Sequence, residues 1–397
     1  MRITAILERP VRLHGNPGGA PANAIVNFSG HTVSLVALIT DAIRGGRPVV
    51  GVSFNSIGRF AQSGILRDRM IPRVLAAPPD ALLDDSGRID PAAVSACALA
   101  DEKPGGHGDR AAAAAALELA CWDLNAKLDD EPAYATIARR FQREPALAVA
   151  VYAAGGYYYP HYSHKGLDQL RDEMRGYRDL GYDAVKMKIG GACRADDLAR
   201  IEAVIDIVGD AGRVAVDANG GFDRSTATQW AAALARYGLR WYEEPGDPLD
   251  FELNHAVTAC YDGAVATGEN LFSVADATNL VRYGGMRPGR DIFQMDAGLS
   301  YGLGEYARML EVLEAHGFDR RFAFPHGGHL INLHITAGLG LGGCESYPAV
   351  FQPFGGYPDG CVVSAGRIAP TDAPGFGLEQ KAGLAELIAE LITDLTT

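Results

Sequence analysis

The sequence predicts an α/β protein in which a closed barrel of alternating strands and helices follows a smaller α+β region. Two observations carry this prediction. From about residue 147 onward, short apolar runs alternate regularly with amphipathic helical segments, a pattern typical of βαβ units and a parallel sheet. The first 145 residues show no such repeat. Seven or eight units over about 200 residues favour a closed barrel over an open sheet.

The first region is predicted to contain a small antiparallel sheet and a well-packed helix. Strands are expected over residues 3–7, 32–40 and 49–54 because these runs are rich in β-branched residues, and Gly45-Gly46 marks a turn between the last two. The alanine-rich segment 111–129 predicts a helix. Residues 13–23 contain three Gly and two Pro, which predicts a loop that is either inert or a mobile lid.

The barrel region divides into predicted strands and intervening helices. The expected strands are residues 147–153, 184–189, 213–217, 240–244, 264–268, 291–296 and 321–325. Helical patterns lie between them, for example at 195–208, 225–237 and 303–316. Beyond about residue 350 the chain is rich in Gly and Pro until a final predicted helix over 378–395, which we expect to pack back on the first region.

Composition and charge narrow the class of protein. The chain has 397 residues and a net charge of −13, so it offers no basic footprint for a nucleic acid. No apolar run is long enough to span a membrane, and Glu8 and Pro10 interrupt the place where a signal peptide needs an apolar core. We therefore expect a cytoplasmic protein with no nucleic-acid or membrane partner. The six dispersed cysteines predict reduced, buried thiols.

Three acidic residues stand at the ends of consecutive predicted strands. Asp217, Glu243 and Glu269 follow one another at intervals of 26 residues, which is one βα unit each time. Residues one unit apart at the carboxyl ends of barrel strands lie side by side on one rim, where barrel active sites form. Any one of them alone could be a solvated loop acid. Three converging carboxylates repel one another unless a hard divalent cation binds them, so the spacing predicts an Mg²⁺ site.

Charged groups also end the preceding and following strands. Lys186 and Lys188 are two residues apart on a strand and point to one face, so both can face the barrel mouth. Each ammonium group is expected to depress the pKa of the other, which would make a usable base, although two surface lysines are the alternative. Asp296 and His326 end the next two strands. A carboxylate beside an imidazole orients it and favours its protonated form, so this pair is a candidate general acid or base.

Two smaller features have simpler interpretations. His329 follows His326 in PHGGH, but its spacing matches no helical zinc motif, so we expect it to cap a helix or support the site. The cluster Tyr157-Tyr158-Tyr159 follows the first barrel strand. These rings could form the wall of a pocket, and ordinary aromatic packing is equally consistent with the sequence.

The order of these motifs resembles one known family. The motifs follow one another in the order found in the mandelate racemase subgroup of the enolase superfamily. Along the chain they are KMK, VAVDAN, YEEP, TGEN, a later Asp and PHGGH. The resemblance covers essentially the whole chain. Within that subgroup the longer segments FNSIGR (54–59), EKPGGHG (102–108), YAAGGYYYP (152–160) and ESYPAVFQPFGG are similar to those of the D-tartrate dehydratases.

The resemblance implies a fold and a set of site residues. The fold would be a (β/α)7β modified TIM barrel at residues 146–350, covered by an α+β capping domain built from residues 1–145 and the tail at 351–397, with the 13–23 loop as a lid. One Mg²⁺ per subunit would bind Asp217, Glu243 and Glu269. Lys188 and the Asp296–His326 pair would be acid/base groups and Lys186 an electrostatic stabiliser. The resemblance also implies a homo-oligomer.

The expected substrate is a small hydroxy acid, and three residues are assigned to binding it: Asn55, Lys103 and Asn219. Lys103 would pair with the second carboxylate of a diacid, since an unpaired buried charge is costly; a solvated lysine in a Gly/Pro turn is the alternative. Asn55 could equally be a turn residue that stabilises its own backbone.

The implied reaction is dehydration of a hydroxy diacid, tartrate first, to a 2-keto acid through abstraction of the α-proton. Dehydration of another acid sugar and racemisation or epimerisation are alternatives within the same architecture. A metal-binding barrel that has lost catalysis is a more distant one; a missing lysine or histidine would favour it, and none is missing.

Overall fold

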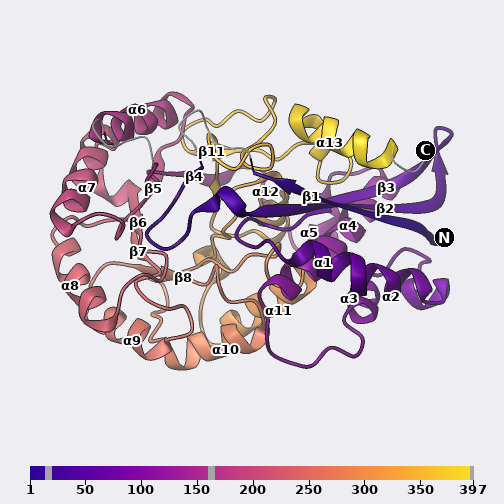
Figure 1. Ribbon diagram of the computed structural model, residues 1–397, viewed down its shortest axis with the longest axis horizontal. Coiled ribbons are helices and arrows are strands. Elements are labelled where there is room, and N and C mark those ends of the chain that lie inside the picture. The colour runs from indigo at the N-terminus through magenta and orange to yellow at the C-terminus, as the bar shows by residue number, and fades with distance from the viewer. Residues whose placement is uncertain (14–19, 160–165, 394–397) are drawn as a thin grey trace.

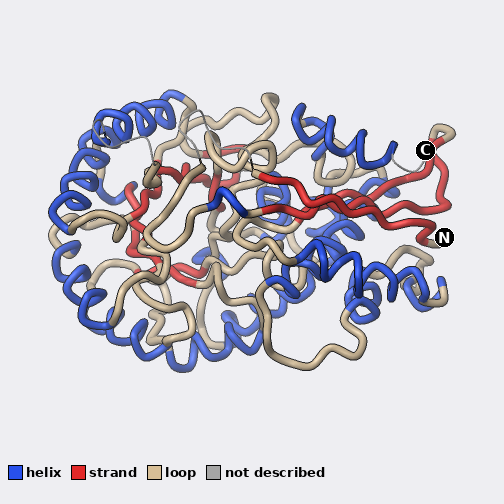
Figure 2. Tube along the Cα trace, viewed as in Figure 1, coloured by secondary structure: helices blue, strands red, loops and turns tan. Residues whose placement is uncertain are grey.

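The computed structural model describes residues 1–13, 20–159 and 166–393. Figure 1 shows a ring of helices around short strands on one side and a long, twisted sheet with its own helices on the other. Figure 2 shows the strands of both parts in red and the helices in blue. The predicted α/β class, with a barrel and a cap that contains an antiparallel sheet, is confirmed.

The cap is organised around a three-stranded antiparallel sheet. Its strands are β1 (Ile3–Arg12), β2 (Thr32–Arg44) and β3 (Arg47–Phe54), in that order. The turn between β2 and β3 is formed by Gly45 and Gly46, which have positive φ angles of 56° and 77°, as a tight hairpin requires. All three predicted strands are therefore present, and β1 is longer than its apolar run suggested.

The alanine-rich helix lies against this sheet. The helix is α4 (Asp109–Asp129), and its six alanines from Ala111 to Ala116 are fully buried. Contact with β3 is close at Gly51, where a Cβ atom would lie only 2.1 Å from the carbonyl oxygen of Ala120. Small residues on both elements thus allow helix and sheet to approach. The other cap helices are α1 (Gln62–Ile65), α2 (Ile71–Ala76), α3 (Pro91–Ala98) and α5 (Ala133–Arg140).

The barrel strands are parallel and follow chain order around the wall. They are β4 (Val149–Gly155), β5 (Ala184–Lys188), β6 (Val214–Asp217), β7 (Trp241–Glu243), β8 (Val265–Thr267), β9 (Ile292–Phe293) and β10 (Cys344–Ser346), and β10 pairs with β4. The first six match predicted strands. The barrel helices are α6 (Gly166–Asp179), α7 (Arg194–Val208), α8 (Arg224–Leu234), α9 (Phe251–Cys260), α10 (Val274–Tyr283), α11 (Leu303–Ala315) and α12 (Leu330–Leu339).

The last part of the barrel wall differs from the prediction. The predicted strand at 321–325 is a 3₁₀ turn, Arg320–Phe322, followed by a single bridge between Phe293 and Ala323. This segment still links β9 to β10, because the N–H of Glu345 donates to the carbonyl of Pro325 at 3.4 Å. β10 lies in a segment that was not among the predicted strands. It is only three residues long, too short for an alternating pattern.

The tail contacts both parts of the molecule. β11 (Arg367–Ile368) pairs with β4 of the barrel, whereas α13 (Ala382–Thr393) packs against β1 and β2 of the cap. An ion pair of 2.8 Å joins Arg9 and Glu390 across that contact. The predicted continuous helix over 378–395 is wrong at its start, since a separate 3₁₀ turn, Leu378–Gln380, precedes α13, and its end lies outside the described residues.

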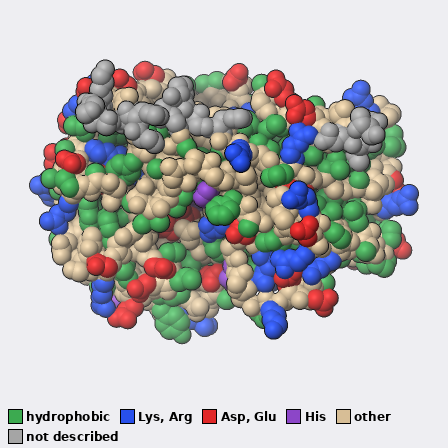
Figure 3. Space-filling view, viewed as in Figure 1, with side chains coloured by type: hydrophobic (Ala, Val, Ile, Leu, Met, Phe, Trp, Pro, Cys, Tyr) green, Lys and Arg blue, Asp and Glu red, His purple; other side chains and the backbone are tan. Residues whose placement is uncertain are grey.

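The expectations drawn from composition concern membrane spans, surface charge and the cysteines. No helix within the described residues is long and apolar enough to cross a membrane. Acidic and basic side chains are interspersed over the face drawn in Figure 3. All six cysteines are free, but the prediction that they are buried is wrong for Cys193 and Cys260, which are exposed; only Cys121 and Cys344 are buried.

Candidate active site

The three evenly spaced carboxylates converge at the carboxyl end of the barrel. Asp217 and Glu243 end the adjacent strands β6 and β7, where they face each other in register, and Glu269 lies two residues beyond β8. Each offers one oxygen, and these oxygens all lie within 4.8 Å of one another. The spacing of one βα unit therefore produced the predicted cluster, and this cluster could hold a metal ion.

The chemistry of the cluster fits a hard divalent cation. Oε2 of Glu269 is buried and has no hydrogen-bond partner among the described residues. Burial and the charge of Asp217 raise the pKa of Glu243 to about 8, so the carboxylates carry the mutual repulsion expected from the sequence. A cation bound by carboxylate oxygens would relieve both the repulsion and the unpaired oxygen.

Both lysines of β5 point into this cluster. The Nζ atom of Lys186 lies 2.5 Å from Glu243 Oε1 and 2.7 Å from Glu345 Oε1, and that of Lys188 lies 2.5 Å from Asp217 Oδ2. Burial favours a lower pKa for Lys188, but Asp217 and Tyr157 outweigh it and raise the pKa. Lys186 does lower the pKa of Lys188, as predicted, but by less than Asp217 and Tyr157 raise it. The predicted net direction of the pKa shift was therefore wrong.

The imidazole of His326 lies beside two carboxylates. Its Nδ1 is 3.2 Å from Asp296 Oδ2, and its Nε2 is 3.9 Å from Glu269 Oε2 and 3.0 Å from the Tyr347 hydroxyl. Burial would lower the pKa of His326, but Glu269 and the hydrogen bond with Asp296 raise it to about 9. The imidazole is therefore protonated at neutral pH.

Contact between the histidine and its carboxylate depends on local backbone features. Gly327 has a φ of 96°, and a Cβ atom there would lie 2.5 Å from Asp296 Oδ2, so only glycine fits beside the carboxylate. The amide of Asn332, on the first turn of α12, donates to Asp296 Oδ1 at 3.0 Å. Both oxygens of Asp296 are thus held in place.

Glu345 and Tyr347 are site residues that the spacing argument missed. Glu345, on β10, accepts from Lys186 and from the N–H of Gly327 at 3.0 Å. It follows His326 by 19 residues (326 to 345), less than the interval of 26 residues between the earlier acids. The loops on either side of α12 are shorter, whereas α12 itself has 10 residues, as does α9 between Glu243 and Glu269. The available signal was the charged residue at the start of the segment ESYPAVFQPFGG.

The smaller motifs also have defined places. His329 is the N-cap of α12, where its Nδ1 accepts from the N–H of Asn332, and its Nε2 lies 2.7 Å from Ser56 Oγ of the cap. The expectation of a helix cap is confirmed. Of the three tyrosines, Tyr157 lies on the cavity wall, with its ring 5.1 Å from Lys188 Nζ.

A small cavity of about 90 Å³ joins these groups to the cap. Lys188, Glu269 and His326 line it from the barrel, and His31 and Arg59 from the cap. Its remaining lining residues are Asn23, Val26, Phe28, Ile57, Gly58, Tyr157, Asn219, Glu244, Asn270, Leu299, Tyr347 and Phe351. Three of these, Asn23, Val26 and Phe28, lie in or just after the predicted lid loop, of which residues 14–19 lie outside the described residues.

Among the three predicted substrate-binding residues, only Asn219 lies on this cavity. Its Nδ2 donates to Asp217 Oδ2 at 3.3 Å, whereas its Oδ1 is buried without a hydrogen-bond partner among the described residues. Asn55 is buried and does not line the cavity: its Oδ1 accepts from the N–H of Ser34 and its Nδ2 donates to the carbonyl of Ser56, both at 2.8 Å. Backbone groups thus bind both the oxygen and the nitrogen of its amide.

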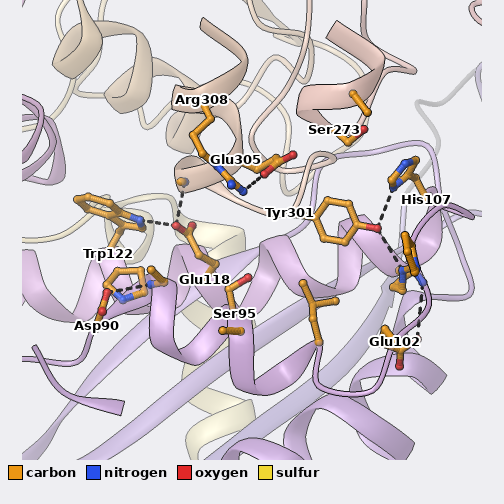
Figure 4. Close-up of a pocket in the computed structure, with 18 of the residues that line it drawn as sticks. Asp90, Ser95, Glu102, His107, Glu118, Trp122, Ser273, Tyr301, Glu305 and Arg308 are labelled. Carbon is orange, nitrogen blue, oxygen red and sulfur yellow. Dashed lines mark hydrogen bonds and ion pairs between the residues drawn. The ribbon is translucent and has the colours of Figure 1, made fainter. Parts of the chain in front are cut away.

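Lys103 is placed elsewhere, contrary to its predicted contact with the substrate. It is exposed, and it borders a separate and larger cavity of about 930 Å³ between the cap and α11, shown in Figure 4. Arg110 fixes this loop by donating to the carbonyl of Lys103 at 2.8 Å. In the same cavity Glu118 already accepts from Trp122 Nε1 and from the N–H of Leu303, both at 2.8 Å.

The fold and the site together define a class of protein: a barrel with a carboxylate cluster at its strand ends, covered by a cap that contains a sheet. Residues 169–383, more than half of the chain, match the family described as enolase C-terminal domain-like. The chain therefore belongs to this family, and the predicted superfamily is confirmed.

Two curated relatives act on acid sugars. L-Talarate/galactarate dehydratase from Salmonella typhimurium is 28% identical over 306 residues, 77% of this chain and 71% of that protein. Arabinonate dehydratase from Saccharolobus solfataricus is 24% identical over 291 residues, 71% of this chain and 73% of that protein. Both relatives are named as dehydratases.

Solved structures share the whole fold. L-Talarate dehydratase from Polaromonas sp. JS666, complexed with Mg and L-glucarate, is 24% identical with a TM-score of 0.74, and the match covers 96% of this chain and 97% of that one. A mandelate racemase/muconate lactonizing enzyme-like protein from Rubrobacter xylanophilus is 24% identical with a TM-score of 0.76, over 98% of this chain and 99% of that one. At these identities the likeness establishes the fold.

Proposed function

We propose that this protein is an Mg²⁺-dependent hydro-lyase that converts a short hydroxy diacid, D-tartrate, to oxaloacetate and water. One observation carries the proposal: Lys188 and His326 both line the same small cavity, together with Glu269 of the carboxylate cluster. The cavity thus brings a candidate base, a candidate acid and a candidate cation site within reach of one small ligand.

Asp217, Glu243 and Glu269 would hold the Mg²⁺ ion. When bound, the ion supplies Lewis acidity to the substrate carboxylate, where charge develops once the α-proton leaves. The similar Polaromonas dehydratase is described with both Mg and an acid-sugar ligand, which supports this assignment. Lys186, held among Glu243, Glu345 and Asp217, adds a fixed positive charge to the same place.

Lys188 is the proposed base. Its ammonium group is stabilised mainly by Asp217, 2.5 Å away. As a metal ligand Asp217 would stabilise that ammonium less, so the pKa of Lys188 would fall toward the range of a usable base. Lys188 would then take the α-proton, and the electron pair of the broken C–H bond would pass into the enolate.

His326 is the proposed acid. Asp296 orients the ring through Nδ1 and favours its protonated form. His326 would donate its Nε2 proton to the β-hydroxyl as the C–O bond breaks. Water leaves, and the resulting enol ketonises to the 2-keto acid.

The size of the cavity supports a short substrate. A volume of about 90 Å³ corresponds to about six to nine water molecules, which is closer to a four-carbon diacid than to a six-carbon one. The similarity of the longer segments to the D-tartrate dehydratases points the same way.

Dehydration of a longer acid sugar is the second candidate. It is favoured by the Salmonella relative, whose name includes talarate and galactarate, and it requires the cap to open further over the site.

A screen of mono- and diacid sugars, each incubated with the protein and Mg²⁺, tests the proposal through release of a 2-keto acid. D-Tartrate is expected to have the highest kcat/KM. Faster turnover of a six-carbon acid would replace tartrate with the second candidate, and no keto acid from any member would contradict hydro-lyase activity.

A further inference from the structure

We propose that Arg59, with His31 beside it, binds the second anionic group of the substrate and so makes this site selective for short diacids. The inference rests on the proposed function and assigns its specificity to the cap rather than to Lys103. Arg59 belongs to the segment that follows β3, and His31 precedes β2. Both line the cavity opposite the barrel groups.

Arg59 is a cation without an acidic partner. Its side chain is half-buried, and no ion pair joins it to an Asp or Glu among the described residues. Its Nη1 donates to the carbonyl of Gly58 and its Nη2 to Asn270 Oδ1, at 2.8 and 3.0 Å, while Nε is buried without a hydrogen-bond partner in the described part of the chain. A half-buried guanidinium that binds only neutral oxygens is suited to accept an anion.

The guanidinium is held rigidly, which favours binding. Its carbon lies 4.8 Å from the centre of the Phe272 ring, a cation–π distance. Asn270, in turn, donates to Glu244 Oε1 at 2.9 Å. Arg59 is therefore fixed from two sides before a ligand binds, so little side-chain entropy is lost on binding.

The distance between Arg59 and the carboxylate cluster limits the length of the ligand. Asn270 bridges them: its Oδ1 accepts from Arg59 at 3.0 Å, and its Nδ2 lies 3.5 Å from Glu269 Oε1. One amide group thus separates the guanidinium from a predicted Mg²⁺ ligand. A four-carbon diacid can reach both ends of this span, whereas a longer chain must fold back.

His31 adds a neutral donor next to the guanidinium. Burial and the charge of Arg59 lower the pKa of His31 below its ordinary value, and the charge of Asp109 opposes them only in part. Its Nδ1 is buried and has no hydrogen-bond partner within the described ranges. A neutral imidazole can donate one N–H to a carboxylate without adding repulsion toward Arg59.

Two ligands of equal length separate this proposal from its alternatives. Tartrate carries a distal carboxylate, and threonate carries a distal hydroxymethyl group instead. Binding is measured by titration calorimetry on the Mg²⁺-loaded Lys188→Ala protein, so that no turnover is needed. We expect Arg59→Met in that background to weaken tartrate binding by about a hundredfold and threonate binding by less than about threefold. Arg59→Lys, which keeps the charge, should recover part of the loss.

Lys103→Met in the same background is the matched control and should change neither affinity by more than about threefold. Equal losses of both ligands in Arg59→Met would make Arg59 a brace for Asn270 and overturn the proposal, as would a tartrate-selective loss confined to Lys103→Met. Unchanged melting temperature of each variant shows that it is folded. If the parent protein binds both acids with the expected selectivity but never forms a keto acid, the proposed reaction fails while the binding inference stands.

Discussion

The barrel rim and the inner face of the cap line the same cavity, but their residues reach it by different routes. Rim residues such as Asp217 and Glu243 stand at the ends of parallel strands, and their positions follow from a repeat of one βα unit. Cap residues such as His31 and Arg59 lie on irregular segments, and long-range contacts position them. Regular topology thus explains the rim groups, whereas the cap groups could be located only in the folded structure.

The largest expected effect is on the rim and concerns the cation. Glu243→Gln removes one of three converging negative charges, and we expect Mg²⁺ affinity and kcat/KM each to fall by at least about a hundredfold. Calorimetric titration with Mg²⁺ and the keto-acid assay measure the two. Glu252→Gln, on an exposed carboxylate of α9, is the control and should change neither. Full activity in excess chelator would contradict the carboxylate site.

A somewhat smaller effect is expected where Asp296 orients His326. Asp296→Asn removes the nearby charge that helps raise the pKa of His326 to about 9, so the pKa should fall toward its usual value near 6.5. Because the protonated form is required, the alkaline limb of the kcat profile should move to lower pH, with a loss of up to about thirtyfold at pH 8. An unmoved alkaline limb would show that another group supplies the proton.

In the cap, a substitution at Asn55 should lower the stability of the protein and leave its catalytic rate nearly unchanged. Asn55→Ala leaves the buried N–H of Ser34 without its acceptor, and we expect a loss of about 1–3 kcal/mol in the free energy of unfolding. Chemical denaturation measures this loss, and kcat/KM should change by less than about threefold. A large rise in KM with unchanged stability would restore Asn55 to the substrate-binding role that the sequence suggested.

The last effect depends on pH and concerns the contact between the two regions. His334 on α12 accepts from the N–H of Tyr134 at 3.3 Å and lies 3.2 Å from Thr371 of the tail, and burial lowers its pKa to about 3. The unfolded chain therefore binds a proton that the native state does not, so stability is full above about pH 6.5 and falls as the pH drops toward 3.

The expected slope from this one group is about 1.4 kcal/mol per pH unit. Denaturation curves between pH 4 and 7 on the wild type and His334→Gln measure it, and the variant should show the shallower dependence. His329, whose pKa burial lowers to about 4, contributes in the same direction and remains in both proteins. Parallel curves would mean that His334 is not the group whose protonation opposes folding.

Most of the barrel and its charged rim could be predicted from the sequence, because apolar runs and acids recur with the period of a βα unit. Glu345 was missed where that period shortens, since the loops on either side of α12 are short. Lys103 does not line the cavity for a different reason: the sequence shows a cation in a loop, but not that this loop borders a separate cavity, where Arg110 donates to the carbonyl of Lys103. Asn55 likewise gave no sign that backbone groups occupy both ends of its amide.

Separation of proton abstraction from loss of water tests the central claim most directly. Each variant is incubated with Mg²⁺ and D-tartrate in deuterium oxide, and nuclear magnetic resonance follows exchange of the α-proton while an assay follows oxaloacetate. His326→Asn is expected to exchange the α-proton but to form little oxaloacetate, and Lys188→Ala is expected to do neither. Exchange at the wild-type rate in Lys188→Ala, or normal oxaloacetate formation in His326→Asn, would contradict the assignment of base and acid.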